Sequence, residues 1–318
     1  MSKKVVVLGG GVLGTQIGLV SAYNGYDVTY WLRSESSVGR TTPKIKMYTD
    51  LMMKDLLQAK ALINNPLGKF LYPKALIPKW EGITVEQIDG YIAQCEKRLK
   101  ENIHIELDMK KALDGAYLVI ESMSENIESK KEVYAAIKDL LPKDTILCTN
   151  TSTLLPSMFA QDTGRPEKYC ALHFANNIWT KNTAEVMGHP GTDPKVFDEV
   201  VKFAASIGMV PLQLHKEQPG YLLNSLLVPF LSAAQQLWAN EVSDPKTIDL
   251  TWELATGAPM GPFKILDIVG LETAYNISLL NPKSKIEGSL EQKVAKLLKE
   301  KIDKGETGIN AKKGFYNY

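Results

Sequence analysis

Short apolar runs alternate with longer segments of helical periodicity through roughly the first two thirds of the chain. The apolar runs predict strands at residues 5–8, 27–31, 118–121, 145–149, 169–173 and 209–214. Because strands and helices alternate along the sequence, this part of the chain predicts a doubly wound α/β sheet.

The pattern changes after about residue 213, where the periodicity becomes helical throughout. Helical runs with proline and glycine between them lie at residues 222–240, 245–256 and 290–304. We therefore predict a sheet domain at residues 1–212 and an all-helical domain at residues 213–318. A helical insertion is predicted inside the first domain, at about residues 40–102.

Composition agrees with a two-domain globular protein. The chain has 318 residues, of which 44% are hydrophobic, and can bury a large core. Its formal net charge is +1 without a basic block, so neither nucleic acid nor a membrane surface is an expected partner. The N-terminal apolar run is shorter than a signal-peptide core, and no segment approaches the roughly 20 apolar residues of a membrane span. We expect a cytoplasmic protein.

The three cysteines are scattered and have no C-x-x-C spacing. They are Cys95, Cys148 and Cys170. An odd number at such spacing favours reduced core thiols over disulfides, and we expect no metal site.

A glycine-rich turn follows the first predicted strand. Gly9, Gly11 and Gly14 form a G-x-G-x-x-G pattern, which is weak alone but specific inside a strand–helix–strand unit. In a Rossmann-type domain the helix after this turn offers unpaired N–H groups to a dinucleotide pyrophosphate. We assign Gly9, Gly11, Val12, Leu13 and Gly14 to cofactor binding.

A second group of polar residues lies near the ends of later apolar runs. Ser152, His173 and Glu185 supply a hydroxyl, an imidazole and a carboxylate. A histidine that titrates near neutrality, an acid that orients it and a donor that holds the substrate oxygen can move a proton on and off an alcohol. His189 and His215 have no such setting and are interpreted as structural or surface residues.

Four more segments complete a family pattern. They are the E-x-x-x-E-N-x-x-x-K segment at residues 121–130, P-G-Y-x-x-N at 219–224, P-M-G-P-F at 259–263 and G-F-Y-x-Y at 314–318. With the glycine-rich turn and the Ser152, His173 and Glu185 set, they resemble the L-3-hydroxyacyl-CoA dehydrogenase family over most of the chain.

The resemblance implies a catalytic role for four residues. His173 would be the base, Glu185 its paired acid, and Ser152 and Asn224 would hydrogen-bond the substrate oxygen. Asn176 would join Ser152 and Asn224 at the substrate. Another interpretation of Ser152 and Asn224 is that they satisfy turn backbone, as serine and asparagine often do.

The resemblance also implies cofactor contacts and partners. Glu125 and Lys130 would lie near the nicotinamide ribose, and Asn150 is assigned to the cofactor as well. Lys130 has the alternative of being a solvated helix charge. The resemblance further implies an acyl-CoA substrate, a role in fatty acid metabolism and a homodimer formed through the helical domain.

The chain departs from the family in two places. The segment between the second predicted strand and Glu125 is longer than the family's helical hairpin, which helps to hold coenzyme A. It contains Met47, Tyr72 and Trp80, which either pack the extra helices or change the coenzyme A contacts. Asn177 stands where the family has proline in H-F-x-N-P, beside the reacting carbon.

The residues after the second predicted strand bear on the choice of cofactor. An acid at this position usually accepts hydrogen bonds from the adenosine 2′-OH of NAD. Here the position is Leu32, and Arg33 and Ser34 follow, with Ser37 and Arg40 close behind. An arginine among hydroxyls suits a 2′-phosphate, so NADP(H) is favoured. The alternative is that Arg33 stacks on the adenine of NAD(H) or is solvated.

The leading hypothesis is an oxidoreductase that transfers a hydride between a nicotinamide cofactor and a 3-hydroxyacyl or 3-oxoacyl substrate, expected to be a CoA thioester. One alternative is a dehydrogenase of a free hydroxy acid of the carnitine or gulonate type. Another is a non-catalytic dinucleotide-binding protein, which the intact Ser152, His173, Glu185 and Asn224 set argues against.

Overall fold

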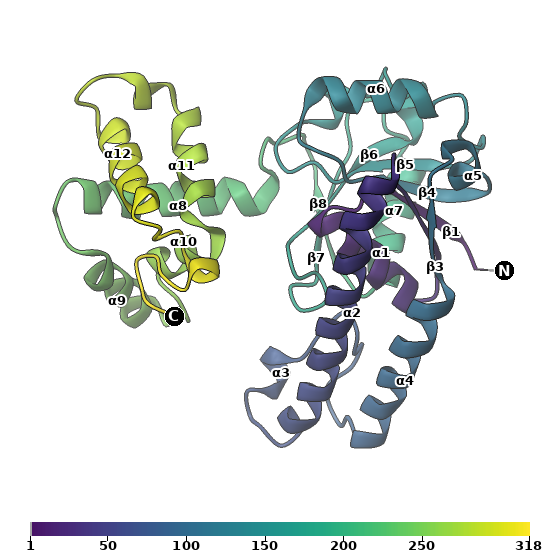
Figure 1. Ribbon diagram of the computed structural model, residues 1–318, viewed down its shortest axis with the longest axis horizontal. Coiled ribbons are helices and arrows are strands. Elements are labelled where there is room, and N and C mark those ends of the chain that lie inside the picture. Colours follow the sequence, from purple (N-terminus) through teal and green to yellow (C-terminus); the bar gives the residue numbers. More distant parts are fainter. Residues whose placement is uncertain (1) are drawn as a thin grey trace. The chain divides into compact units, whose positions relative to one another are not determined.

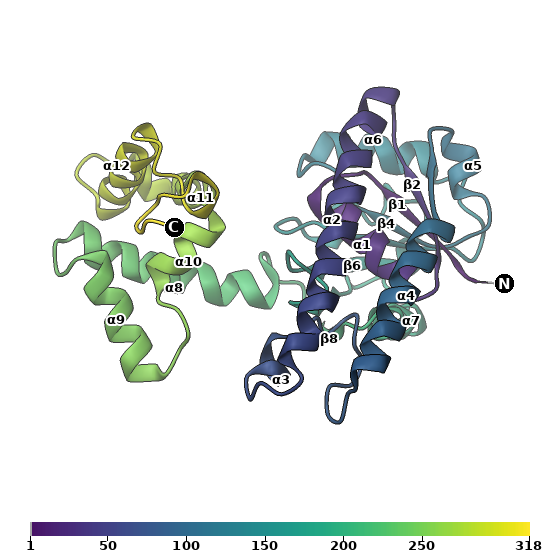
Figure 2. The ribbon, with the colours of Figure 1, turned by 60° about the horizontal axis from the view of Figure 1, so that its bottom comes forward.

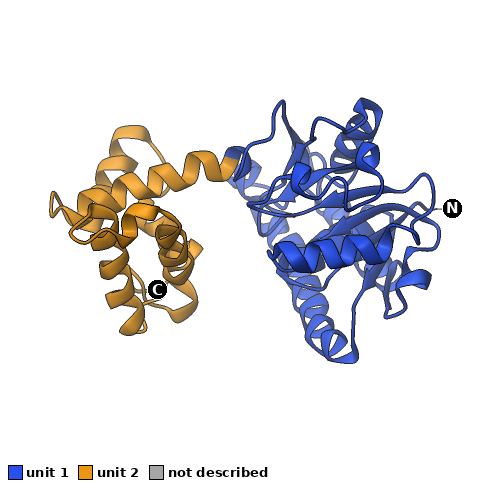
Figure 3. Ribbon diagram, turned by 90° about the horizontal axis from the view of Figure 1, so that it is seen from above, with its two compact units in different colours: residues 1–222 blue, residues 223–318 orange. Residues whose placement is uncertain are grey.

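The computed structural model describes residues 2–318, which form two compact units. Unit 1 runs to Leu222, and unit 2 comprises Leu223–Tyr318 (Figure 3). The boundary predicted at 212/213 would fall within strand β8 (Val210–Leu214), which is paired in the sheet of unit 1.

The described part of unit 1 contains one eight-stranded sheet in the order β3-β2-β1-β4-β5-β6-β7-β8 (Figure 1). Its first seven strands are β1 (Lys4–Leu8), β2 (Asp27–Trp31), β3 (Ile103–Glu106), β4 (Ala116–Glu121), β5 (Ile146–Thr149), β6 (Tyr169–Phe174) and β7 (Thr183–Met187). Neighbouring strands are parallel except for β6 and β7. The order reverses between β1 and β4, a position at which doubly wound sheets bind ligands.

Helices cover both faces of the sheet, which confirms the predicted doubly wound fold. Successive side chains of a strand point to opposite faces. Val5 and Val7 pack in one apolar cluster with α1 (Val12–Tyr23) and α7 (Pro194–Ser206). Val6 and Leu8 pack in the other cluster, with α5 (Met109–Leu113) and α6 (Ile127–Ile137).

The predicted helical insertion is confirmed and begins earlier than expected. It consists of α2 (Glu35–Leu62), α3 (Gly68–Leu71) and α4 (Val85–Glu101), and the two long helices lie side by side (Figures 1 and 2). Ser34 starts α2 because its hydroxyl accepts the N–H of Ser37 as an N-cap.

The side chains of the insertion agree with the packing interpretation. Residues at helical spacing face the core of unit 1, namely Tyr48, Met52, Leu56 and Ala59. Trp80 is buried and its ring stacks on Tyr72, with 4.8 Å between the ring centres. Met47 is exposed instead.

Unit 2 is helical, as predicted. Its helices are α8 (Tyr221–Ala239), α9 (Pro245–Thr256), α10 (Pro262–Val269), α11 (Leu271–Leu280) and α12 (Leu290–Asp303), and α8 begins in unit 1. Leu231, Phe263 and Leu298 are among its core residues. The buried carboxylate of Asp267 accepts the backbone N–H groups of Phe315 and Tyr316, which fixes the C-terminal segment to the core.

Among residues 2–318, no helix combines the length and hydropathy that crossing a membrane requires. Cys95, Cys148 and Cys170 are buried and form no disulfide. Cys148 and Cys170 lie opposite each other on β5 and β6, with 3.8 Å between their sulfur atoms.

Candidate active site

The turn between β1 and α1 leaves a helix N-terminus open. Gly9 has φ of +109°, and a Cβ there would lie 2.7 Å from the carbonyl oxygen of Ser122. Gly14 lies so close to the carbonyl of Gly9 that a side chain would collide with it. Gly11 caps α1 without a side-chain hydrogen bond, and no neighbouring heavy atom would lie nearer than 4.0 Å to its Cβ. Gly11, Val12 and Leu13, at the N-terminal end of α1, line a cavity, as pyrophosphate binding requires.

A cavity of about 750 Å³ lies at the carboxyl ends of β1, β2, β4 and β5. This volume is within the usual range of about 300–1,000 Å³ for small-molecule sites. Its wall contains these predicted site residues: Gly9, Gly11, Val12, Leu13, Arg33, Glu125, Asn150, Ser152 and Asn176. Gly14, Ser34, Lys130 and His173 lie outside its wall.

Cations line the part of the cavity that follows β2, and among the described residues of that part no carboxylate lies on the wall. Leu32 is 2% exposed and cannot accept a hydrogen bond from a ribose. Arg33 follows it on the cavity wall, together with Arg40 and Lys44 from the first turns of α2. Ser34 serves as the N-cap of α2 instead of lining the cavity.

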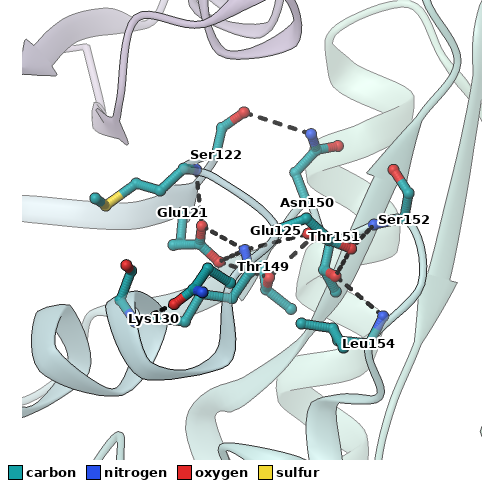
Figure 4. A network of polar contacts seen from close by, with 12 residues as sticks. Glu121, Ser122, Glu125, Lys130, Thr149, Asn150, Thr151, Ser152 and Leu154 are labelled. Atoms are coloured by element: carbon teal, nitrogen blue, oxygen red, sulfur yellow. Dashed lines mark hydrogen bonds and ion pairs between the residues drawn. The ribbon is translucent and has the colours of Figure 1, made fainter. Parts of the chain in front are cut away.

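A fully buried ion pair lies beneath the loops that follow β4 and β5. Glu121 ends β4, and Lys130 of α6 donates to its two oxygens at 2.7 and 2.8 Å (Figure 4). Thr149 and Tyr134 donate to the same carboxylate at 2.7 and 3.0 Å. Several donors thus compensate the desolvation of Glu121. The ammonium of Lys130 is committed to this pair, 3.6 Å from the carboxylate of Glu125.

Glu125 holds the loop that carries Ser152. One of its carboxylate oxygens accepts the backbone N–H groups of Ser152 and Thr153, each at 2.9 Å, and the hydroxyl of Thr151 (Figure 4). Burial acts to raise the pKa of Glu125, but the bond from Thr151 and the charge of Lys130 outweigh it and hold the pKa below its usual value. The ionised carboxylate therefore fixes Ser152 at the cavity wall.

His173 and Glu185 lie opposite each other on the antiparallel strands β6 and β7. Nδ1 of His173 is 2.9 Å from Oε2 of Glu185, and both side chains are buried. Oε1 of Glu185 accepts the N–H of Leu222 at 2.8 Å. The ring of Tyr221 stacks on the imidazole, with 4.5 Å between the ring centres. Because Nδ1 faces the acid, Nε2 is the nitrogen that remains for a substrate.

The three predicted asparagines have different settings. Oδ1 of Asn150 accepts the N–H of Phe174 at 3.1 Å, and its amide nitrogen lies 3.4 Å from the hydroxyl of Ser122. Asn150 thereby joins the carboxyl ends of β4, β5 and β6. Asn176 lies on the cavity wall. Asn224 belongs to α8 within unit 2, and its contact with the substrate stays a prediction.

Gln16 and Tyr221 have no role among the sequence-based predictions, and Glu121 has no predicted partner. The sequence does contain a signal for two of them. Glu121 ends an apolar strand, where a carboxylate needs a buried partner. Gln16 is a long polar residue in a helical run whose other residues are small or apolar. The stacking of Tyr221 has no comparable signal, because it depends on a positive φ of 56°.

Two family models match the chain. The 3-hydroxyacyl-CoA dehydrogenase NAD-binding domain matches residues 83–218, and the C-terminal domain of the same family matches residues 220–318. The human mitochondrial hydroxyacyl-coenzyme A dehydrogenase is 27% identical over 99% of this chain and 91% of its own length. A 3-hydroxybutyryl-CoA dehydrogenase of Clostridioides difficile is 28% identical over 99% of both chains.

Solved structures of similar proteins have the same fold as this chain. A diketoreductase, described as performing substrate-directed dual catalysis of dicarbonyl compounds, is 40% identical. Its TM-score is 0.78, and the match covers 100% of this chain and 99% of the diketoreductase chain. The (S)-3-hydroxybutyryl-CoA dehydrogenase of Ralstonia eutropha is 21% identical with a TM-score of 0.75, covering 100% and 99%, and supports the fold alone.

Proposed function

Because this chain belongs to the 3-hydroxyacyl-CoA dehydrogenase family, we propose that it oxidises a 3-hydroxyacyl compound, or reduces the corresponding 3-oxoacyl compound, with a nicotinamide cofactor. The observation that carries the proposal is the buried His173–Glu185 pair at the end of a nucleotide-binding sheet. A general base in this position contributes about 10² to 10⁴ to the rate.

The residues of the cavity fit a dinucleotide. Gly11 leaves the N-terminus of α1 accessible, and Glu125 and Asn150 lie further along the same wall. A nicotinamide cofactor bound there would supply the hydride acceptor. His173 takes the hydroxyl proton on Nε2, while Glu185 holds the ring and stabilises the imidazolium. Ser152, fixed by Glu125, donates to the substrate oxygen.

The cofactor preference that we propose is NADP(H) over NAD(H). It is supported by Arg33, Arg40 and Lys44 on the cavity wall and by Leu32 in the place of an acid. A 2′-phosphate accepts charge-assisted hydrogen bonds from such groups, whereas a ribose 2′-OH gains little from them. Equal affinity of the protein for NADPH and NADH would contradict this preference.

A smaller substrate is the second candidate. The diketoreductase at 40% identity is described as acting on dicarbonyl compounds, and the CoA-dependent relatives above are 21–28% identical. A free β-dicarbonyl compound has the same reacting ketone as a 3-oxoacyl thioester, so the His173 and Ser152 geometry serves both. In that case the enlarged insertion would not hold coenzyme A and would have a different role at the site.

One assay distinguishes the two substrates. Purified protein is incubated with NADPH or NADH and with acetoacetyl-CoA or a free 1,3-dicarbonyl ester, and the absorbance of the reduced cofactor is followed. A much higher kcat/KM for acetoacetyl-CoA supports the acyl-CoA substrate, and the reverse supports the free dicarbonyl. Turnover of neither compound would refute the proposed function.

We also propose a homodimer formed through unit 2. Helices α8 and α9 carry large apolar side chains that are exposed in the single chain, among them Leu226, Leu250, Trp252 and Leu254. Exposed apolar patches of this kind often mark an interface. Sedimentation equilibrium of the pure protein tests the proposal, as does the loss of association in Leu254→Glu. We also propose that the protein is cytoplasmic.

A further inference from the structure

The loop that follows β6 has a backbone that proline cannot adopt. Asn177 has φ of +60°, whereas the ring of proline fixes φ near about −65°. The N–H of Asn177 also donates to Oε1 of Gln16 at 2.8 Å, and proline has no N–H to give. The conformation of residues 175–180 therefore differs from that of a loop with proline at this position.

Gln16, together with the backbone N–H of Asn177, determines which end of the Asn176 amide faces the cavity, because both donate to Oδ1 of Asn176. Its side chain is fully buried, and its Oε1 accepts the backbone N–H groups of Asn177 and Ile178. A backbone N–H can only donate, so the opposite end of Gln16 must be the amide nitrogen. This nitrogen donates to Oδ1 of Asn176 at 2.7 Å. Nδ2 of Asn176 is thus the atom that remains to donate into the cavity.

The insertion holds the other end of this loop. Trp179 is 2% exposed, and its indole N–H donates to Oδ2 of Asp55 on α2 at 2.7 Å. The indole also packs against Tyr48 of α2, with 6.0 Å between the ring centres and an angle of 62°. The carbonyl of Trp179 accepts the N–H of Ala75, which follows α3. The loop is therefore anchored by α1 at one end and by the insertion at the other.

We propose that Gln16 and Asp55 are positioning residues that determine substrate selectivity. They hold the loop so that the amide of Asn176 donates to the second carbonyl oxygen of a β-dicarbonyl substrate. His173 and Ser152 serve the ketone that is reduced, and the second carbonyl is an acceptor that needs its own donor. The inference rests on the proposed function, and it gives the lengthened α2 a role as the support of a site loop.

Gln16→Glu tests the orientation of the amide. The ionised carboxylate of this variant still accepts the two backbone N–H groups but cannot donate to Oδ1 of Asn176. The repulsion between the two oxygens favours the reversed amide, which presents its oxygen to the cavity. We expect KM for a free 1,3-dicarbonyl ester to rise about tenfold, the worth of one hydrogen bond, with cofactor affinity unchanged. The loss should shrink as the pH falls and the buried carboxyl takes up a proton, because the acid can then donate again.

Asn24→Asp is the matched control. Asn24 caps the same helix, and its amide bonds the carbonyls of Val20 and Ile207 away from the cavity. The substitution makes the same amide-to-acid change and can lower stability, but it should leave KM and its pH dependence as in the wild type. If Gln16→Glu retains the wild-type KM at every pH, or if Asn24→Asp reproduces its pH-dependent KM, the inference is wrong.

Asp55 is tested with two variants. Asp55→Asn keeps an acceptor for Trp179 and should behave like the wild type, whereas Asp55→Leu removes it and should raise KM several-fold with a smaller change in kcat. Equal KM values in the two variants would overturn the role of Asp55. A wild-type protein that reduces no β-dicarbonyl refutes the proposed function, whereas an active wild type with unaffected variants refutes only this inference.

Discussion

At the scale of single residues, Glu185 prepares His173 before a substrate arrives. Its two carboxylate oxygens have different partners, the imidazole of His173 and the N–H of Leu222. A carboxylate that is bonded at both oxygens cannot rotate freely, so the imidazole stays in one orientation, with Nδ1 and not Nε2 toward the acid. The reorganisation needed during proton transfer is therefore small.

Replacement of the base should abolish most of the activity. We expect His173→Ala to lower kcat by at least about 10² and to leave cofactor affinity nearly unchanged. Steady-state kinetics and a fluorescence titration of NADPH measure the two effects. His215→Ala, at an exposed histidine of unit 1, is the control and should stay active. Retention of most activity in His173→Ala would refute the mechanism.

Arg33 should discriminate between the two cofactors. Removal of a charge-assisted bond to a 2′-phosphate costs about 1.5–3 kcal/mol, so Arg33→Ala should weaken NADPH binding by about 10- to 150-fold. NADH binding should barely change. Lys46→Ala removes an equal charge from α2, at a lysine paired with Asp50 off the cavity wall, and serves as the control. An equal loss of both cofactors in Arg33→Ala would contradict the prediction.

At the scale of elements, the pair of Glu121 and Lys130 joins β4 to α6. Lys130→Met leaves a buried carboxylate without its cation and should lower the free energy of unfolding by about 3–5 kcal/mol. Urea denaturation measures the loss. Lys131→Met changes the neighbouring lysine of the same helix, which is less buried, and should cost far less. If Lys130 were solvated instead of buried, Lys130→Met and Lys131→Met would lower the free energy of unfolding by similar amounts.

The elements also show what the sequence can predict. Local signals predict strand β1 and helix α9. An apolar run marks β1, and a proline at the first helical position marks the start of α9. Strand β3 is short and half polar, and Glu185 interrupts the apolar run of β7, so the apolar pattern predicts neither strand. The commitment of Lys130 to Glu121 and the contact of Asp55 with Trp179 depend on tertiary packing that no local pattern contains.

At the scale of the whole molecule, the last residues of the chain stabilise unit 2. The hydroxyl of Tyr316 donates to the buried Asp249 at 2.8 Å, and its N–H donates to Asp267. Burial and the adjacent Asp249 raise the pKa of Tyr316 above its usual value of 10.0. The phenol therefore stabilises the fold fully below pH about 10, and this contribution is lost as the pH rises through the folded-state pKa.

Tyr316→Phe should lower the free energy of unfolding by about 1 kcal/mol at neutral pH. It should also flatten the decline of stability above pH about 10, because the variant has no phenol at this position to titrate. Urea unfolding of the full chain at several pH values, followed by circular dichroism, measures both. A variant that loses stability at alkaline pH as steeply as the wild type would show that another group is responsible.

The left-handed backbone of Asn177 also restricts the evolutionary routes open to this sequence. A proline at this position would have to change φ and would leave Oε1 of Gln16 without one of its donors. A change of Gln16 made first would remove the acceptor of Asn177 and Ile178. Either order passes through a weakened intermediate, so the two positions are epistatic. In recombination with proline-bearing relatives, residues 175–180 should be exchanged together with their supports on α1 and α2.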